Sequence, residues 1–488
     1  MKFNQYTWDL YKQSSGGQKA IKEFEEARES ILEYDLTCKY NPYLTNLLDK
    51  EQFADTCGTL WYYAFQNMTP PENLEDAKDF YVALITLGIL DEHKEFIVEK
   101  GDYRLMLSIN NALSFLLYYF APEYYFPNLF VCRFFDFNKT ADTFDIDLPS
   151  IPKKSDYQAR CMYYWELCKV LYQFRTENEL TPAELCAFLY DFSPNFIPKG
   201  KTEIPKPAQA WFIGGKTDPV EAKLDVTFWQ ANKETKKGDI LVHYETSPVS
   251  ALSCLWIAQT DGVIDPFFHY YSNTYIGNKI EIPHITLREL QADEYFSKHP
   301  LVRKKFQGVN GWTLSSEDYS RLLEMISAKG FNVNLLPHLY APQIAKDDIL
   351  IVNERSVETE LLEPLLNSMG WYENKDFIRQ LPIHAGRGHR IFPDYALHYD
   401  NKPDYERAKV LIEAKLYMKN NQEIEETFKQ ARSYANILES SVVILCDKNC
   451  LLVYEKKDSF NRYSYTKYYW EDMETPDKFN ELKNKLDI

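Results

Sequence analysis

The sequence predicts a multidomain α+β protein, in which a helical N-terminal domain, a small β-rich domain and a C-terminal α/β domain follow one another. The chain has 488 residues, 45% of them hydrophobic, which allows about two to four domains. The spacing of apolar residues changes from helical to strand-like near residue 209 and becomes mixed after residue 348. Prolines gather near both changes, so linkers are expected there.

Residues 1–192 are expected to form the helical domain. Apolar side chains recur there at helical spacing among charged ones, and no polar cluster suggests chemistry. The linker that follows is rich in proline, which cannot continue the hydrogen bonding of a helix or a strand. The predicted helices are Lys19 to Tyr34, Leu105 to Phe120 and Ala159 to Phe174, and the linker prolines are Pro194, Pro198, Pro205 and Pro207.

Residues 208–328 are expected to form the β-rich domain, because short apolar runs alternate with turn signals such as Lys237-Gly238-Asp239. Ser315 and Asp318 have the spacing of a capping box, which predicts the start of a closing helix. A second linker with two prolines follows that helix. The predicted strands are Ala210–Ile213, Asp239–Tyr244, Ala251–Ala258, Phe267–Tyr271 and Lys279–Ile282.

Residues 345–488 are expected to form the α/β domain, and its candidate chemistry begins with the strand 408–415. Alternate residues of a strand share a face, so Glu413 and Lys415 point the same way. Asp394 stands just before a second short strand. If the two strands pair antiparallel across the polar loop between them, Asp394 lies beside Glu413.

Two carboxylates and a lysine at one place suit the hydrolysis of phosphodiester bonds. Carboxylate oxygens bind Mg²⁺, which lowers the pKa of a water and neutralises charge on a phosphate. Lys415 can orient the attacking water and stabilise the transition state. A Glu-x-Lys pattern alone is more often an exposed strand face, but the neighbouring features favour a catalytic interpretation here.

A helix that begins after Asn353, its predicted N-cap, offers a further carboxylate. Glu354 and Glu358 share one face of this helix, and Glu354 is the favoured catalytic candidate. Acidic residues also suit a helix start for reasons of the helix dipole alone. On a later predicted helix, Gln430 and Tyr434 are four residues apart and share a face that could reach the substrate backbone or a water at the metal.

These motifs together resemble the PD-(D/E)xK nuclease superfamily, and more narrowly the nuclease domain of type I restriction enzyme R subunits, over about residues 350–456. The resemblance implies a restriction-endonuclease-like fold and a Mg²⁺ ion, replaceable by Mn²⁺, bound by Asp394, Glu413 and the Ala414 carbonyl. It also implies that Lys415 is the catalytic lysine. The motifs are the helix glutamate, Phe392-Pro393-Asp394, Ile412-Glu413-Ala414-Lys415 and the accessory Gln430-Ala431-Arg432-Ser433-Tyr434.

The β-rich segment more weakly resembles EVE domains, which belong to the PUA-like superfold. The resemblance implies a pocket lined by aromatic side chains that holds a modified base. A flipped base would stack on tryptophan or tyrosine and offer its edge to polar groups. Packing in the core is the alternative for each aromatic residue. The candidates for this pocket are Trp211, Trp229, Asn232, Tyr244 and Trp256.

The resemblances imply a Mg²⁺-dependent endonuclease that hydrolyses DNA, as a modification-dependent restriction or anti-phage defence enzyme. One site cuts one strand, so a homodimer is expected for double-strand cleavage. The sequence has no Gly-x-x-x-x-Gly-Lys-[Ser/Thr] phosphate loop, so no nucleotide-driven motor is expected. The alternatives are an RNA-directed, tRNA-type nuclease, a DNA nuclease that a partner activates and whose middle domain does not sense base modification, and a binding protein without activity.

Charge and hydropathy limit the partners. The net charge of −17 argues against a basic footprint over the whole molecule, although the loop 384–390 carries only cationic or titratable side chains among its glycines and alanine. The first residues lack a basic segment followed by an apolar run, and no apolar stretch reaches the ~18 residues of a membrane span. A cytoplasmic protein without a membrane partner is therefore expected.

Overall fold

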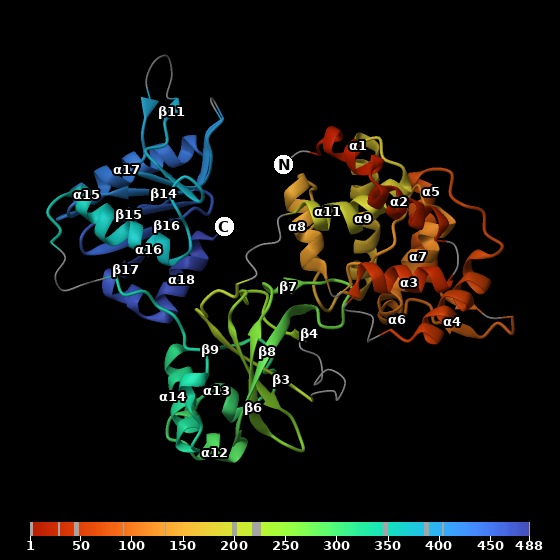
Figure 1. Cartoon of the computed structure of the whole chain (residues 1–488), viewed down its shortest axis with the longest axis horizontal. Helices are drawn as coiled ribbons and strands as arrows, with labels where there is room; N and C mark the ends of the chain where they lie inside the picture. The colour runs from red at the N-terminus through yellow and green to blue at the C-terminus, as the bar shows by residue number, and fades with distance from the viewer. Residues whose placement is uncertain are drawn as a thin grey trace. The chain divides into compact units, whose positions relative to one another are not determined.

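The protein combines α-helices with two large β-sheets and is described here from a computed structural model (Figure 1). The chain divides into two compact units, Met1–Pro205 with Trp211–Trp312, and Lys206–Ala210 with Thr313–Ile488. The first unit holds both the predicted helical segment and most of the predicted β-rich segment. The described residues are 3–27, 30–42, 48–90, 92–131, 133–197, 203–216, 226–344, 350–384, 390–402 and 405–487.

The N-terminal part of the first unit is helical, apart from a two-stranded sheet of β1 (Ile89–Leu90) and β2 (Phe96–Val98). Two of the predicted helices are divided, at Ala27 and at Ile109. The helices are α1 (Gln5–Gln13), α2 (Ser15–Glu26), α3 (Ser30–Tyr40), α4 (Lys50–Leu60), α5 (Leu74–Leu87), α6 (Tyr103–Ser108), α7 (Asn110–Phe120), α8 (Phe134–Phe144), α9 (Tyr157–Glu177), α10 (Pro182–Ala187) and α11 (Ser193–Phe196), with π-helical turns at Trp61–Phe65 and Phe188–Phe192.

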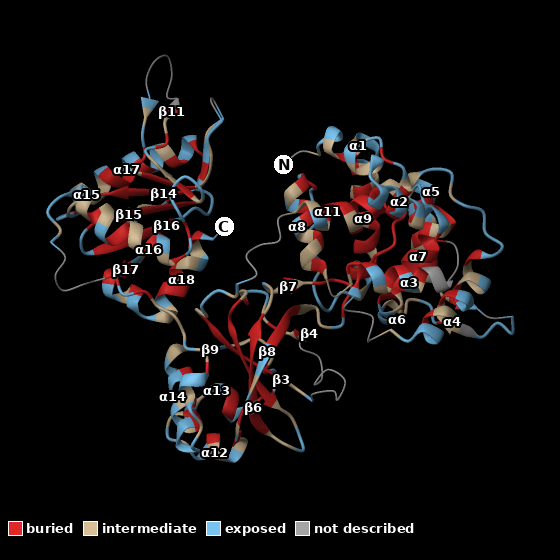
Figure 2. Cartoon of the chain, in the orientation of Figure 1, coloured by how far each residue is buried: buried red, intermediate tan, exposed pale blue. Residues whose placement is uncertain are grey.

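Aromatic packing accounts for much of the high aromatic content of this chain. Trp8 lies edge-on to Phe188 and Phe192, with ring centroids 6.1 and 5.3 Å apart. Phe188 in turn packs on Phe144 and Phe174 at 4.9 and 5.1 Å. Such ring pairs add to the free energy of area burial by about 0.5–1.5 kcal/mol each. The helical core is therefore an aromatic one (Figure 2, red).

A buried arginine joins the helical part to the β part of the first unit. Arg160 of α9 is 4% exposed. Its guanidinium donates to the carbonyl oxygens of Pro266 and Phe268 at 2.7 and 3.1 Å. Phe267, between them, packs into the helical core. The prediction of a strand at 267–271 is therefore wrong: this apolar run is a turn that anchors the two parts to each other.

The β part contains one long sheet with the order β4-β8-β6-β5-β3, in which β4, β8, β6 and β5 are antiparallel neighbours, and β7 pairs with β8. The predicted strand at Lys279–Ile282 is confirmed as part of the longest strand. The strands are β3 (Ala210–Gly215), β4 (Val226–Gln230), β5 (Ile240–Glu245), β6 (Ala251–Ala258), β7 (Val263–Ile264) and β8 (Ser272–Thr286); the short helices α12 (Leu287–Ala292), 3₁₀ η5 (Phe296–Lys298) and α13 (Pro300–Arg303) follow, and β9 (Trp312–Leu314) stands at the boundary of the units.

The second unit is built on a six-stranded sheet with the order β10-β13-β14-β15-β16-β17, in which only β14 and β15 are parallel neighbours. The strands are β10 (Phe377–Arg379), β13 (Tyr395–Asp400), β14 (Arg407–Ala414), β15 (Val442–Cys446), β16 (Cys450–Glu455) and β17 (Thr466–Tyr469), and β11 (Ile383–His384) pairs separately with β12 (Arg390–Ile391). The helices are α14 (Ser316–Ala328), α15 (Glu354–Val357), α16 (Glu363–Ser368), α17 (Asn421–Ile437) and α18 (Pro476–Leu486), with 3₁₀ turns at Val333–Leu335 and Trp470–Glu474 and a π-helical turn η7 at Glu358–Leu362.

Helices cover both faces of this sheet (Figure 1, cyan to blue). Val410 and Ile412 of β14 share a core with residues of α16 and α18. Leu411 points to the opposite face, where it shares a core with Phe428 and Ala431 of α17. The predicted caps Ser315 of α14 and Asn353 of α15 are confirmed, because each accepts a hydrogen bond from the third residue after it. No helix in the described part of the chain is long and apolar enough to cross a membrane.

Candidate active site

Strand pairing brings the two candidate carboxylates together at the C-terminal end of β14, inside the six-stranded sheet. β13 and β14 pair antiparallel with Tyr395 opposite Ile412. Asp394, directly before β13, therefore lies beside the end of β14, and its Oδ2 accepts a hydrogen bond from the backbone N–H of Ala414 at 2.8 Å. This is the arrangement expected from the two strand patterns and the polar loop between them.

Glu413 is a buried carboxylate with an unsatisfied oxygen. Its side chain is 1% exposed, and its Oε2 accepts a hydrogen bond from Nε2 of Gln430 at 3.1 Å. Its Oε1 is buried and has no hydrogen-bond partner. Burial, and then the neighbouring carboxylate of Asp394, raise the pKa of Glu413 to about 8, against the opposing effect of Lys415. A cation bound here would stabilise the ionised form of this carboxylate.

Lys415 follows β14 directly and is held by its backbone, whose N–H donates to the carbonyl of Cys446 at 2.9 Å. Its ammonium lies 3.8 Å from a carboxylate oxygen of Glu354 at the start of α15. Glu358 is occupied elsewhere, because it pairs with Arg355 at 2.7 Å and with Arg379 at 3.6 Å. Of the two helix glutamates, Glu354 is thus the one that lies beside the candidate catalytic lysine.

The accessory residues of α17 face the same carboxylate. Gln430 donates to Glu413, as described above. Tyr434, one turn later, is partly buried, and its pKa is raised by this burial and by the negative charge of Glu413. The structure therefore gathers all six predicted site residues around the end of β14. They are Asp394, Glu413 and Lys415 from the strands, Glu354 from α15, and Gln430 and Tyr434 from α17.

The carboxylates of the site fit a hard cation that takes only one or two of its ligands from the protein. Among the described residues, no group of three or more His, Cys, Asp and Glu side chains could hold a metal ion. Asp394 and Glu413 supply two carboxylates, and Mg²⁺ retains several waters and needs only one or two carboxylates from a protein. The unpartnered Oε1 of Glu413 is the observation that fits such an ion best. The role of the Ala414 carbonyl stays a prediction.

Three of the five base-pocket candidates come together as a packed cluster in the first unit. Trp211, Trp229 and Trp256 share a core with Leu241 and other apolar residues, and each is at most 5% exposed. Trp211 donates its indole N–H to Asp239 at 2.8 Å, and Trp229 donates to the side-chain oxygen of Asn310 at 3.3 Å. The tryptophans are closely packed, so the expectation of a base pocket stays a prediction.

The other two candidates lie outside this cluster. Tyr244 stacks on Phe306, with ring centroids 4.0 Å apart, and Asn232 donates to the carbonyl of Gly311 at 3.1 Å. His243 does adjoin the cluster, because its ring lies edge-on to Trp229 at 5.1 Å. Sequence reasoning missed His243, because β5 is buried continuously from Ile240 to Tyr244 and its residues do not alternate between a buried and an exposed face.

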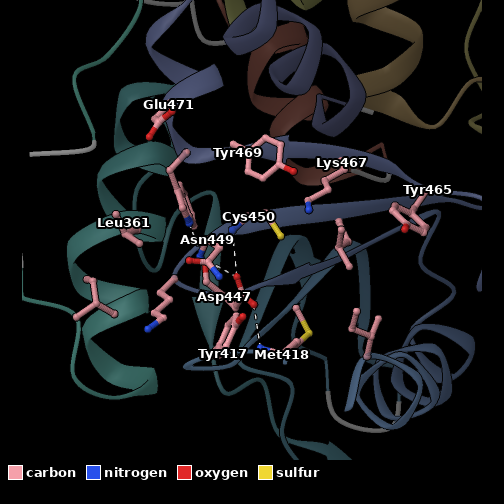
Figure 3. A pocket seen from close by; sticks show the side chains of 15 residues that line it. Leu361, Tyr417, Met418, Asp447, Asn449, Cys450, Tyr465, Lys467, Tyr469 and Glu471 are labelled. Carbon is pink, nitrogen blue, oxygen red and sulfur yellow. Dashed lines mark hydrogen bonds between the residues drawn. The ribbon is translucent and has the colours of Figure 1, made fainter. Parts of the chain in front are cut away.

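A cavity of about 590 Å³ lies close to the candidate site in the second unit (Figure 3). Its wall includes Tyr417, two residues after Lys415, and reaches Lys448 on the turn between β15 and β16. Sequence reasoning missed this cavity, because its residues come from segments far apart in the chain. The cationic loop predicted at 384–390 cannot be compared with it, since residues 385–389 lie outside the described residues.

Comparisons of the chain with protein-family models, with curated proteins and with solved structures give no match. The resemblances to PD-(D/E)xK nucleases and to EVE domains therefore stay predictions. What the site can do follows from its own geometry: a buried carboxylate with a partly exposed one beside it, a lysine next to them and an amide that orients the buried carboxylate.

Proposed function

We propose that this chain is a Mg²⁺-dependent endonuclease that hydrolyses phosphodiester bonds of DNA, in restriction or anti-phage defence. One observation carries the proposal. The carboxylate of Glu413 is buried beside that of Asp394, and one of its oxygens has no hydrogen-bond partner. Lys415 follows two residues later, directly after the end of β14. A buried carboxylate next to a second carboxylate is unfavourable without a cation, so its presence near a lysine supports a functional site.

The residues have separate roles in this proposal. Asp394 and Glu413 hold Mg²⁺, which when bound lowers the pKa of a water and neutralises charge on a phosphate oxygen. Lys415 donates from its ammonium to the attacking water or to the phosphate, where charge develops. Gln430 fixes the orientation of Glu413 by its hydrogen bond, and Glu354 holds the lysine ammonium near the strand end.

The choice of DNA and of a modified base rests on the sequence resemblances. In this proposal the β part of the first unit would select the substrate, and two copies of the chain would act together to cut both strands. Trp211, Trp229 and Trp256 are buried together in one apolar cluster. Base sensing by these side chains therefore requires that the cluster opens. The experiment below separates base sensing from cleavage.

The test is cleavage of matched DNAs by the full chain in the presence of Mg²⁺. The substrates are unmodified DNA, DNA with 5-methylcytosine, 5-hydroxymethylcytosine or glucosylated bases, and a tRNA pool. We expect cleavage of DNA by the wild-type chain and none by Asp394→Asn. Asp400→Asn serves as the matched control, because Asp400 lies at the far end of β13, the strand that Asp394 precedes. This variant should cut DNA like the wild-type chain.

The outcomes separate the parts of the proposal. Cleavage restricted to one modified DNA supports both the nuclease and the sensor. Equal cleavage of all DNAs supports the nuclease and contradicts modification sensing. Cleavage of tRNA alone contradicts the choice of DNA, and cleavage that persists in Asp394→Asn contradicts the site itself.

A further inference from the structure

The cavity beside the candidate active site is surrounded by exposed tyrosine and lysine side chains. Three tyrosines with large exposed surfaces stand on its rim: Tyr417, Tyr465 and Tyr469 are 40%, 44% and 51% exposed. Exposed aromatic residues gathered at one hollow mark a binding surface more often than chance packing does. Figure 3 shows these three rings around one space.

Two lysines complete the rim, on a chain whose net charge is −17. The ammonium of Lys448 lies 5.1 Å from the ring centre of Tyr417. The ammonium of Lys467 lies 4.4 Å from the ring centre of Tyr469. Both lysines are exposed, and neither has an ion pair among those the structure gives for the described residues. The rim thus presents positive charges and aromatic ring faces together, although the chain as a whole is negatively charged.

The carboxylate at the floor of the cavity is already fully used. Asp447 is 2% exposed and accepts hydrogen bonds from the backbone N–H groups of Met418, Asn449 and Cys450 at 2.9, 2.8 and 3.0 Å (Figure 3). It therefore fixes the two loops that carry Tyr417 and Lys448. The other acidic residue of the lining, Glu471, is exposed to solvent. Asp447 therefore supports the loops around the cavity, and its carboxylate is turned to their backbone N–H groups. An anion can approach the lysines on the rim.

The cavity begins where the candidate active site ends. Tyr417 follows Lys415 by two residues, a span of at most about 7 Å between Cα atoms. The chain between them is held beside the next strand, because Lys448 donates its backbone N–H to the carbonyl of Leu416 at 3.2 Å. A phosphate at Lys415 would therefore lie within reach of a neighbouring nucleotide in the cavity.

We propose that this cavity holds one unpaired nucleotide of the strand that is cut, with its base on the tyrosine rings and its phosphate on Lys448 and Lys467. The inference rests on the proposed nuclease function and deepens it, because it assigns the enzyme a substrate with a single-stranded segment next to the cut. Stacking of a base on an aromatic side chain contributes about 1–3 kcal/mol and tolerates any base. The cavity volume of about 590 Å³ is that of a small-molecule site.

The first test is binding without cleavage. Fluorescence anisotropy measures the affinity of the full chain, in EDTA, for a labelled single-stranded oligonucleotide and for a blunt duplex. We expect Tyr469→Ala and the double variant Lys448→Ala/Lys467→Ala to bind the single strand about tenfold more weakly or worse. The slope of log affinity against log salt should become shallower by about 0.7 for the lysine variant, because one phosphate contact is lost, and should stay constant for the tyrosine variant.

Matched controls lie at the far end of β16 and on a separate loop. Lys456→Ala/Lys457→Ala removes the same charge, and Tyr405→Ala removes another exposed ring. Both should bind like the wild-type chain. Equal affinity of the cavity variants and these controls would overturn the proposal. Tight binding of free thymidine monophosphate, with no effect of the cavity variants on the oligonucleotide, would also overturn it, since the cavity would then serve a free nucleotide.

A second arm keeps this inference distinct from the proposed function. Cleavage of a duplex with a single-stranded flap is compared with that of the blunt duplex, and the wild-type chain should prefer the flap. Loss of that preference in Tyr469→Ala, with blunt cutting retained, supports the cavity. If no DNA is cleaved but the cavity variants still weaken binding, the proposed nuclease function is contradicted and the nucleotide site in the cavity is supported.

Discussion

At the scale of single residues, Gln430 is the contact that most directly orients the buried carboxylate. It supplies the hydrogen bond that Glu413 receives from a side chain. A hydrogen bond to a charged group contributes about 1.5–3 kcal/mol. We expect Gln430→Ala to lower the cleavage rate about tenfold or more while DNA affinity changes little.

Steady-state kinetics and an anisotropy assay of the same variant check this expectation. Gln422→Ala, on the exposed start of the same helix, is the matched control and should behave like the wild-type chain. A fall in affinity with an unchanged rate would show that Gln430 acts on substrate binding and does not position Glu413.

His243 makes a prediction about pH. Its side chain is 2% exposed, and burial, followed by the positive charge of Lys279, lowers its pKa to about 4 from the ordinary 6.5. Between these values the unfolded chain binds a proton that the folded chain does not. The stability that neutral His243 contributes is therefore complete above pH 6.5 and is lost as the pH falls toward about 4, by up to about 3 kcal/mol.

Urea unfolding at pH 7 and at pH 5 measures this loss. The wild-type chain should lose more stability between these values than His243→Gln does. An equal loss in both would show that the acid sensitivity of this unit comes from other groups. The pH range above 6.5 serves as an internal reference, because His243 is neutral there in both the folded and the unfolded chain.

At the scale of elements, an aromatic contact is part of the packing of helix α17 on the sheet. Phe428 is 1% exposed, and its ring lies 4.7 Å from that of Tyr454. Phe428→Ala should lower the free energy of unfolding by about 3–5 kcal/mol, because it removes buried area and leaves a cavity. Gln430 would lose its fixed position as a result.

Chemical denaturation checks the loss, with Lys429→Ala as the control. Lys429 is the next residue along the helix and is exposed, so its change should stay within about 0.5 kcal/mol. A loss for Phe428→Ala no larger than that of the control would contradict the packing of α17 described above.

Local elements were largely predictable from the sequence, because their causes are local. The caps Ser315 and Asn353, and the strand that carries Glu413, follow from spacing within a few residues. The run at 267–271 was assigned to a strand because it is apolar, whereas Phe267 instead fills a distant helical core. The cavity near Lys415 combines segments that run from Ile351 to Glu471 in the chain. Periodicity holds no information about such long-range contacts.

At the scale of the whole molecule, Arg160 links the helical part of the first unit to its β part. It is buried and bonds two carbonyl oxygens of the turn at 266–268. Arg160→Met would leave these carbonyls unpaired and cost about 1–3 kcal/mol for each. We expect the variant to unfold at a lower temperature, with the two parts separating into distinct transitions.

Calorimetry follows these transitions, and Lys169→Met is the control because Lys169 lies on the exposed face of the same helix. A single transition at the wild-type temperature would show that the turn is held by its apolar contacts alone.

The central claim is that Asp394 and Glu413 together hold a divalent cation. The most direct measurement is Mn²⁺ binding by the full chain, followed by electron paramagnetic resonance, in the wild type and in Asp394→Asn/Glu413→Gln. We predict saturable Mn²⁺ binding that Mg²⁺ displaces, lost in the double variant and retained in Asp400→Asn. Unchanged Mn²⁺ binding in the double variant would contradict the claim.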